Sequence, residues 1–133
     1  MNILTKPKVK KVLNDLKKIK KNGIWFDDKI NKFKQLFGDN QLWIYCHHEG
    51  DGEYKSWYKD GQLDIHCFFN KKGKLEGEYK EWYKNGQLNI HCFFNGSNVK
   101  NPYKDEYKEW WNNGKLKKHI IFNKDGSVKE KIV

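Results

Sequence analysis

A cysteine directly follows a histidine at two places in this chain of 133 residues, and both side chains can bind metal ions. The pairs are His66-Cys67 and His91-Cys92. If these segments are strands, adjacent residues point to opposite faces, and neither pair can hold one ion. Cys46, Cys67 and Cys92 would share a face on strands roughly 10 Å apart, too far for a disulfide or a shared zinc ion. We therefore predict no metal site and no cofactor, and we expect the cysteines to be unpaired, buried thiols.

A second possibility is general base catalysis by the histidines that recur at positions 66, 91 and 119. Glu81 and Glu109 are predicted to lie on the same face, but no column of serines or cysteines accompanies them as nucleophiles. The sequence also contains neither a phosphate-binding glycine loop nor the motif G-x-S-x-G. The sequence therefore favours a protein that is not an enzyme.

A sequence repeat positions all of these residues. Complete copies occupy residues 52–76, 77–101 and 105–133, and a half copy occupies residues 41–50. The second complete copy, for example, begins GEYKEWYKNGQLNIHCFF. A fixed period of roughly 20–50 residues indicates an array of small units that must stack to bury a core. We expect the repeat region to extend over residues 38–133.

Turn residues divide each copy into two strands. The segments 59–61, 84–86 and 112–114 end in Asp-Gly or Asn-Gly, which are the strongest short signals for a hairpin. Residues 70–73 and 123–126 are typical of turns between successive hairpins. We therefore expect a mainly β fold, an antiparallel meander of repeated hairpins with about seven or eight strands.

The turns allow the two faces of the sheet to be predicted. A three-residue turn that ends in glycine places Trp82 opposite Leu88 and Tyr79 opposite His91, and side chains then alternate along each strand. The tryptophans could stack on single-stranded nucleic acid, but their alternation with leucine, isoleucine and phenylalanine favours a core. The predicted core face carries Trp57, Leu63, Ile65, Cys67 and Phe69, then Trp82, Leu88, Ile90, Cys92 and Phe94, then Trp110, Leu116, Lys118, Ile120 and Phe122.

The opposite face is predicted to be amphipathic, with aromatic rings, histidines and glutamates. Tyrosine is typical of recognition surfaces because it offers area and a hydrogen bond at a low entropy cost. Equivalent residues would lie about 10 Å apart, which suits an extended or helical protein segment better than a small molecule. The predicted binding residues are Tyr54, Tyr79, Glu81, Tyr83, His66, His91, Phe93, Tyr107 and His119.

The motif G-x-Y-x-x-W/Y-W/Y-x-N/D-G-x-L occurs at residues 52–63 and 77–88, and at residues 105–116 with Asp105 in place of the first glycine. It resembles the MORN repeat, and more closely the variant found in bacterial antitoxin-like proteins and in large DNA viruses of amoebae. The resemblance covers residues 41–133. It implies stacked hairpins in an elongated, twisted sheet with a groove, and a role in scaffolding, protein–protein contact or phospholipid binding.

Residues 1–37 lie outside the repeats and are strongly basic. Their 11 lysines and three aspartates give a net charge of +8. The spacing of apolar residues predicts helices over residues 6–21 and 27–37, and residues 23–37 are alternatively a decayed repeat. A basic segment over residues 6–34 could attach the protein to an acidic membrane surface or to a nucleic acid. The lysines that would do so include Lys8, Lys10, Lys11, Lys17, Lys18, Lys20 and Lys21.

The remaining composition narrows the function further. All 27 basic residues are lysines, so the chain lacks the arginine that reads guanine in specific DNA recognition. No apolar run approaches about 18 residues and no signal peptide begins the chain, so we expect a cytoplasmic location, or host cytoplasm or virion if the protein is viral. The sequence favours a noncatalytic binding or scaffolding module with a protein partner. Attachment to an acidic membrane surface or a nucleic acid is the alternative.

Overall fold

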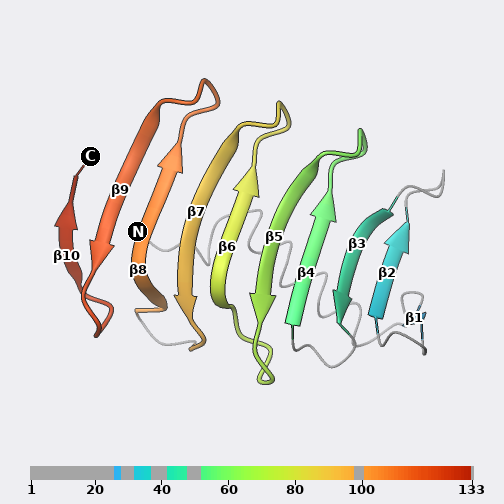
Figure 1. Ribbon diagram of the computed structural model, residues 1–133, viewed down its shortest axis with the longest axis horizontal. Helices are drawn as coiled ribbons and strands as arrows, with labels where there is room; N and C mark the ends of the chain where they lie inside the picture. The colour runs from blue at the N-terminus through green and yellow to red at the C-terminus, as the bar shows by residue number, and fades with distance from the viewer. Residues whose placement is uncertain (1–25, 28–31, 37–41, 48–51, 98–100, 133) are drawn as a thin grey trace.

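The computed structural model describes residues 26–27, 32–36, 42–47, 52–97 and 101–132, with side chains for the last two ranges. The described residues form one sheet of ten strands, which run from β1 at one edge to β10 at the other in chain order (Figure 1). Every neighbouring pair is antiparallel, so the predicted mainly β meander is confirmed. The strands are β1 (Phe26–Asp27), β2 (Lys32–Leu36), β3 (Leu42–His47), β4 (Gly52–Trp57), β5 (Leu63–Phe69), β6 (Glu76–Trp82), β7 (Leu88–Asn95), β8 (Tyr103–Trp110), β9 (Leu116–Phe122) and β10 (Val128–Lys131).

An Asp-Gly or Asn-Gly turn closes each hairpin of the complete copies, as predicted. In the first copy, the Tyr58 amide donates to the Gln62 carbonyl over 2.7 Å, and the Gly61 amide donates to the Tyr58 carbonyl over 2.9 Å. The Asp60 side chain accepts a bond of 3.0 Å from the Gln62 amide. Gly61 has a φ of 94°, a left-handed conformation that glycine adopts without steric cost. The same contacts recur in the two later copies.

A β-bulge beside each turn reverses the predicted face of the first strand in each copy, whereas Ile65, Cys67 and Phe69 of the second strand, with their apolar equivalents in the later copies, lie in the core as predicted. Trp82 lies opposite Leu88 as expected, but the register then shifts, and Tyr79 lies opposite Cys92 rather than His91. The same shift occurs in the hairpins of the first and third copies. One extra residue in a strand moves every later side chain to the other face, so the predicted pairing was wrong by one residue.

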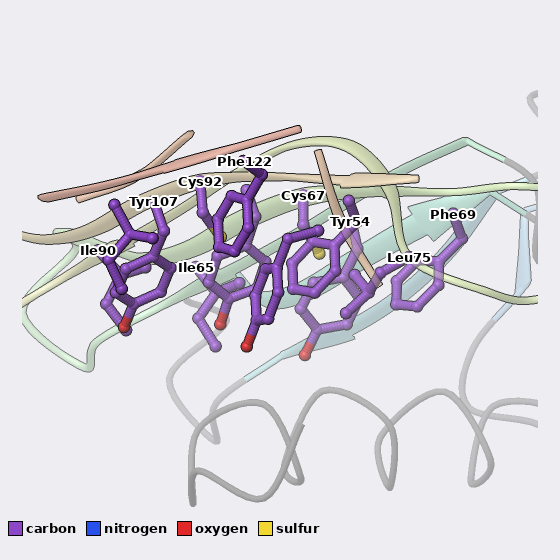
Figure 2. Packing of buried hydrophobic residues seen from close by; sticks show 13 residues of the cluster. Tyr54, Ile65, Cys67, Phe69, Leu75, Ile90, Cys92, Tyr107 and Phe122 are labelled. Atoms are coloured by element: carbon purple, nitrogen blue, oxygen red, sulfur yellow. The ribbon is translucent and has the colours of Figure 1, made fainter. Parts of the chain in front are cut away.

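The core therefore lies on the face that carries the tyrosines, here named the tyrosine face (Figure 2). Tyr54 meets Phe69 edge to face, with ring centroids 6.2 Å apart, and Tyr79 meets Phe94 in the same way at 5.6 Å. Cys67 and Cys92 are buried on this face, as predicted. The buried apolar residues are Tyr54, Ile65, Cys67, Phe69, Leu75, Tyr79, Ile90, Cys92, Phe94, Tyr103, Tyr107, Ile120 and Phe122.

The prediction that tryptophan belongs to the core was wrong. Trp57, Trp82 and Trp110 each follow a buried residue of the tyrosine face in their strands, so they point to the opposite face, where they are half-buried. Leu63 and Leu88, opposite the first two tryptophans, are half-buried as well. Because the bulge follows the leucines, they do not share the face of the isoleucines two residues later.

The segment before the complete copies also differs from expectation. A helix over residues 27–37 was wrong for residues 32–36, which form β2 and pair with β3. Phe26 of β1 pairs with Phe33 of β2, which agrees with the alternative of a decayed repeat over residues 23–37. The helix expected over residues 6–21 lies outside the described residues. Within the described part of the chain, no helix is long and apolar enough to cross a membrane.

Candidate functional site

The face opposite the tyrosines carries a charged and aromatic set in each complete copy. The first strand of each copy contributes a glutamate, a lysine and a tryptophan, and the second strand contributes a histidine and an apolar residue. All of these side chains are half-buried. This histidine face consists of Glu53, Lys55, Trp57, His66 and Phe68, then Glu78, Lys80, Trp82, His91 and Phe93, then Glu106, Lys108, Trp110, His119 and Ile121.

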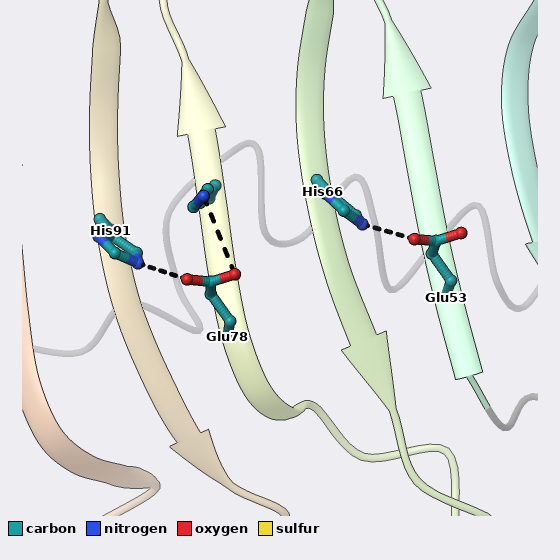
Figure 3. A network of polar contacts seen from close by, with 5 residues as sticks. Glu53, His66, Glu78 and His91 are labelled. Carbon is teal, nitrogen blue, oxygen red and sulfur yellow. Dashed lines mark hydrogen bonds and ion pairs between the residues drawn. The ribbon is translucent and has the colours of Figure 1, made fainter.

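A glutamate and a histidine from neighbouring strands contact each other in every complete copy. In each pair, the imidazole Nε2 atom meets one carboxylate oxygen (Figure 3). The shared geometry fixes the imidazole on the sheet and points Nε2 along it toward the preceding strand. The pairs and their separations are His66 and Glu53 at 2.8 Å, His91 and Glu78 at 2.9 Å, and His119 and Glu106 at 2.9 Å.

A lysine two residues after each glutamate adds positive charge to the pair. Lys108 Nζ lies 3.8 Å from Glu106, and the first two copies repeat this contact at 3.9 Å. The hydrogen bond from His119 lowers the pKa of Glu106, with a smaller contribution from the charge of Lys108, although burial acts in the opposite direction. The carboxylate therefore stays ionised, and the histidine and the lysine hold it in place.

The aromatic residues of this face pack on the histidines. The rings of His66 and Phe68 have centroids 5.2 Å apart, and those of His91 and Phe93 are 5.3 Å apart. Together with the tryptophans, these rings give the face apolar area between its charged groups. The histidine face thus has both the apolar contact area and the polar groups that recognition requires.

In the second copy, the polar side chains of the tyrosine face are buried and hydrogen-bonded to each other. The Tyr79 hydroxyl donates to Glu81 over 2.8 Å, and the Asn89 side-chain amide donates to the other oxygen of Glu81 over 3.0 Å. Burial, and secondly the charge of Glu81, raise the pKa of Tyr79 well above its usual value. Neither Tyr79 nor Glu81 is accessible to a partner, since their exposed fractions are 0% and 3%.

The first copy arranges this buried charge differently. Ser56 stands where the second copy has Glu81, and Asp64 stands where it has Asn89; both Ser56 and Asp64 are buried. The carboxylate has therefore moved from the first strand to the second. The prediction of the faces missed Asp64. The aligned copies nevertheless show the signal, because Glu81 and Asn89 are exchanged together for Ser56 and Asp64. Such a paired exchange indicates that the two residues of each pair contact each other.

The structure divides the predicted binding residues between the two faces. The prediction was wrong for Tyr54, Tyr79, Tyr107 and Glu81, which the bulge turns into the core. Tyr83 is half-buried, and its hydroxyl donates to the Trp110 carbonyl over 2.7 Å. The histidines and Phe93 lie on the histidine face. The lysines expected to bind anions, Lys8, Lys10, Lys11, Lys17, Lys18, Lys20 and Lys21, lie outside the described residues.

The possible metal ligands of the described chain do not converge. No group of three or more histidine, cysteine, aspartate or glutamate residues within it could hold a metal ion. Each imidazole meets the carboxylate of its own copy on the preceding strand, although the strands of successive copies are direct neighbours in the sheet. Within the described part of the chain, the histidine–glutamate pairs form a repeated surface.

Comparison with known proteins identifies the repeat. The family model of the MORN repeat variant matches residues 50–71, 75–95 and 106–124. No curated protein matches the chain. A crystal structure of an S. aureus TarM mutant in complex with Fondaparinux, alpha-GlcNAc-glycerol and UDP is 14% identical, with a TM-score of 0.46, over 84% of this chain. The chain spans 22% of that protein's length, and a likeness at this level indicates nothing about function.

Proposed function

We propose, since the chain is a MORN-type repeat protein, that it is a noncatalytic binding module which docks a protein partner on the histidine face. One observation carries this proposal: three copies present equivalent half-buried apolar and charged side chains on one face of one sheet. Equivalent strands lie about 10 Å apart, so an extended or helical segment of a partner can contact more than one copy.

The contacts within the histidine face support a preformed surface. Each glutamate already meets a histidine and a lysine, and the histidines of the first two copies already meet a phenylalanine ring. Side chains that are held before binding lose less conformational entropy when a partner docks. The tryptophans, half-buried among these pairs, are the residue type that most often dominates the affinity of an interface.

The test uses a double variant in the central copy, His91→Ala with Phe93→Ala. Tagged protein is incubated with lysate of the native host at low and at high salt, and the affinity of the captured protein is then measured by calorimetry. We expect one protein to remain bound at high salt, and the double variant to bind it at least about tenfold more weakly. The control is Lys84→Ala, an exposed turn residue outside the histidine face, which should leave the affinity unchanged.

Equal affinity of the wild type and the double variant would contradict this proposal. Recovery of only lipid or nucleic acid, and only at low salt, would instead favour attachment through the lysine-rich segment of residues 6–34. That alternative rests on the net charge of +8 in residues 1–37. Replacing Lys17, Lys18, Lys20 and Lys21 by glutamine would then remove the salt-sensitive binding, because each lysine near an anionic surface adds to the attraction.

A further inference from the structure

Side chains of one copy reach the backbone of the next copy at the turn end of the hairpins. The Tyr58 hydroxyl donates to the Trp82 carbonyl over 2.7 Å, and the Tyr83 hydroxyl donates to the Trp110 carbonyl over the same distance. The Asn85 side-chain amide likewise donates to the Asn112 carbonyl over 2.9 Å. Each copy thus carries donors that the following copy satisfies.

The third copy presents the same positions without a following copy among the described residues. Trp111 stands at the position of Tyr58 and Tyr83, and its exposed fraction is 50%. Leu116 stands at the position of Leu63 and Leu88, which are half-buried, and it is 37% exposed. The strand β10 pairs only with the far part of β9, from Ile120 to Phe122 (Figure 1).

The exposed large apolar residues of the described chain gather at this end of the sheet. They are Trp111, Leu116, Val128 and Ile132, all from the third copy. The Ile132 amide donates to the His119 carbonyl over 2.9 Å, so backbone pairing reaches His119. The part of β9 nearer the turn, with Trp111 beside it, forms a corner that is both apolar and basic, named here the β9 corner and made of Trp111, Leu116 and Lys118. Lys117 Nζ lies 4.3 Å from the centroid of the Trp111 ring and adds a second positive charge.

The charge of the corner indicates what can cover it. In the inner copies, Ile65 faces Glu81 of the next strand, and Ile90 faces Glu109. Lys118 stands at the position of these isoleucines and already lies opposite Glu109 on its inner side. A segment could pair with the outer side of β9 in the same register that joins the inner copies. The residue of that segment equivalent to Glu81 and Glu109 would then lie opposite Lys118, and a carboxylate there would attract the lysine. Lysines at a sheet edge also disfavour pairing with the same lysine-rich edge of a second molecule of this protein.

We propose that the β9 corner binds an extended acidic segment of a partner protein, in the place that the following copy occupies for the inner copies. Such a segment supplies a carboxylate to Lys118, a backbone carbonyl to the Trp111 indole N–H, and apolar cover to Leu116. The corner adjoins the histidine face at Leu116, which lies opposite Trp110, but Trp111 and Lys118 are not part of that face, so the probes test the corner whether or not that face binds a partner. Addition of an extended segment at a free sheet edge is a recurrent mode of peptide recognition.

The experiment titrates two capped peptides into isotopically labelled full-length protein and follows backbone amide signals. The first probe, Tyr-Glu-Glu-Trp-Tyr-Glu, keeps the Glu-Trp-Tyr order of the second copy, and the second has lysine at each glutamate. We expect saturable shifts around Trp111, Leu116 and Lys118 with the acidic probe, and binding at least about tenfold weaker with the basic probe. Lys118→Glu should also weaken the binding of the acidic probe about tenfold.

The matched control is Lys124→Glu, which makes the same charge change on an exposed turn of the same copy and should leave binding within about twofold. Lys118→Gln provides a milder variant if Lys118→Glu does not fold. Equal binding of both probes, equal weakening by the two charge reversals, or no saturable shift at the corner would overturn the proposal. A dimer of the protein alone that buries Trp111 would also overturn the proposal, since a second molecule of the protein would then occupy the corner.

Discussion

Removal of one buried hydroxyl tests whether the tyrosine face is the core. In the Tyr79→Phe variant, Glu81 loses a hydrogen bond of 2.8 Å inside the sheet, while the bond of 3.0 Å from Asn89 remains. A buried hydrogen bond to a charged group contributes about 1.5–3 kcal/mol, so we expect the free energy of unfolding to fall by about 2 kcal/mol. Urea unfolding followed by circular dichroism measures this change.

The Tyr83→Phe variant is the matched control, because it removes a hydroxyl that bonds a half-buried backbone carbonyl rather than a carboxylate. A neutral hydrogen bond contributes about 1 kcal/mol, so this variant should lose about half as much stability. If Tyr79→Phe loses no more than Tyr83→Phe, the tyrosine face is not the buried face and the register described above is wrong.

The ionisation of Tyr79 gives the same variant a second readout. Burial raises the pKa of Tyr79 above its ordinary value of 10.0, so the folded protein keeps the phenol neutral at a pH where the unfolded chain ionises. Stability from this residue is complete below about pH 10 and is lost as the pH rises further, by about 1.4 kcal/mol per pH unit. Above pH 10, the free energy of unfolding of Tyr79→Phe should therefore fall less steeply with pH than that of the wild type.

Other parts of the structure give three further predictions. Gly77→Ala should lower the free energy of unfolding by about 1 kcal/mol in urea melts, because Gly77 has a φ of 86° while a Cβ atom there meets nothing within 4 Å; unchanged stability would contradict the strain. The folded protein lowers the pKa of Glu106 below its unfolded value of about 4.3, so this residue adds stability that is present above that pH and is lost as the pH falls. His119→Gln should therefore flatten the acid side of the plot of unfolding free energy against pH, and an identical acid side in the variant would exclude the pair. Thiol titration of denatured, unreduced protein should find every cysteine free, and an internal disulfide would contradict the separation of the cysteine strands.

The repeats, the hairpins and the order of the strands could be predicted from the sequence. Each of these depends on local signals: the recurrence of GEYK and the Asp-Gly or Asn-Gly turns, whose hydrogen bonds the structure reproduces. Successive strands joined by such turns pair as neighbours, and so the meander follows from the turns alone. The burial of Cys67 and Cys92 followed from their places in the repeat.

The faces could not be predicted from alternation, because the bulge adds one residue without a glycine or proline to mark it. Asp64, Asn89 and Lys117 follow the leucines at the bulge, and each is polar in a place where strict alternation expects an outward side chain. Leu63 and Ile65 therefore looked like residues of one face. The periodic signal over residues 27–37 failed for another reason: pairing of β2 with β3 outweighed a helical spacing of apolar residues.

Cross-strand contacts in solution test the central claim, that the bulge turns the tyrosines inward and leaves the histidines on the face proposed to bind a partner. Nuclear Overhauser effects between backbone protons report which residues lie opposite each other in β6 and β7. The structure predicts signals that join Tyr79 to Cys92 and Lys80 to His91, together with the pair of Trp82 and Leu88 beside the turn. Signals that join Tyr79 directly to His91 would contradict it, because the tyrosines and histidines would then share one face.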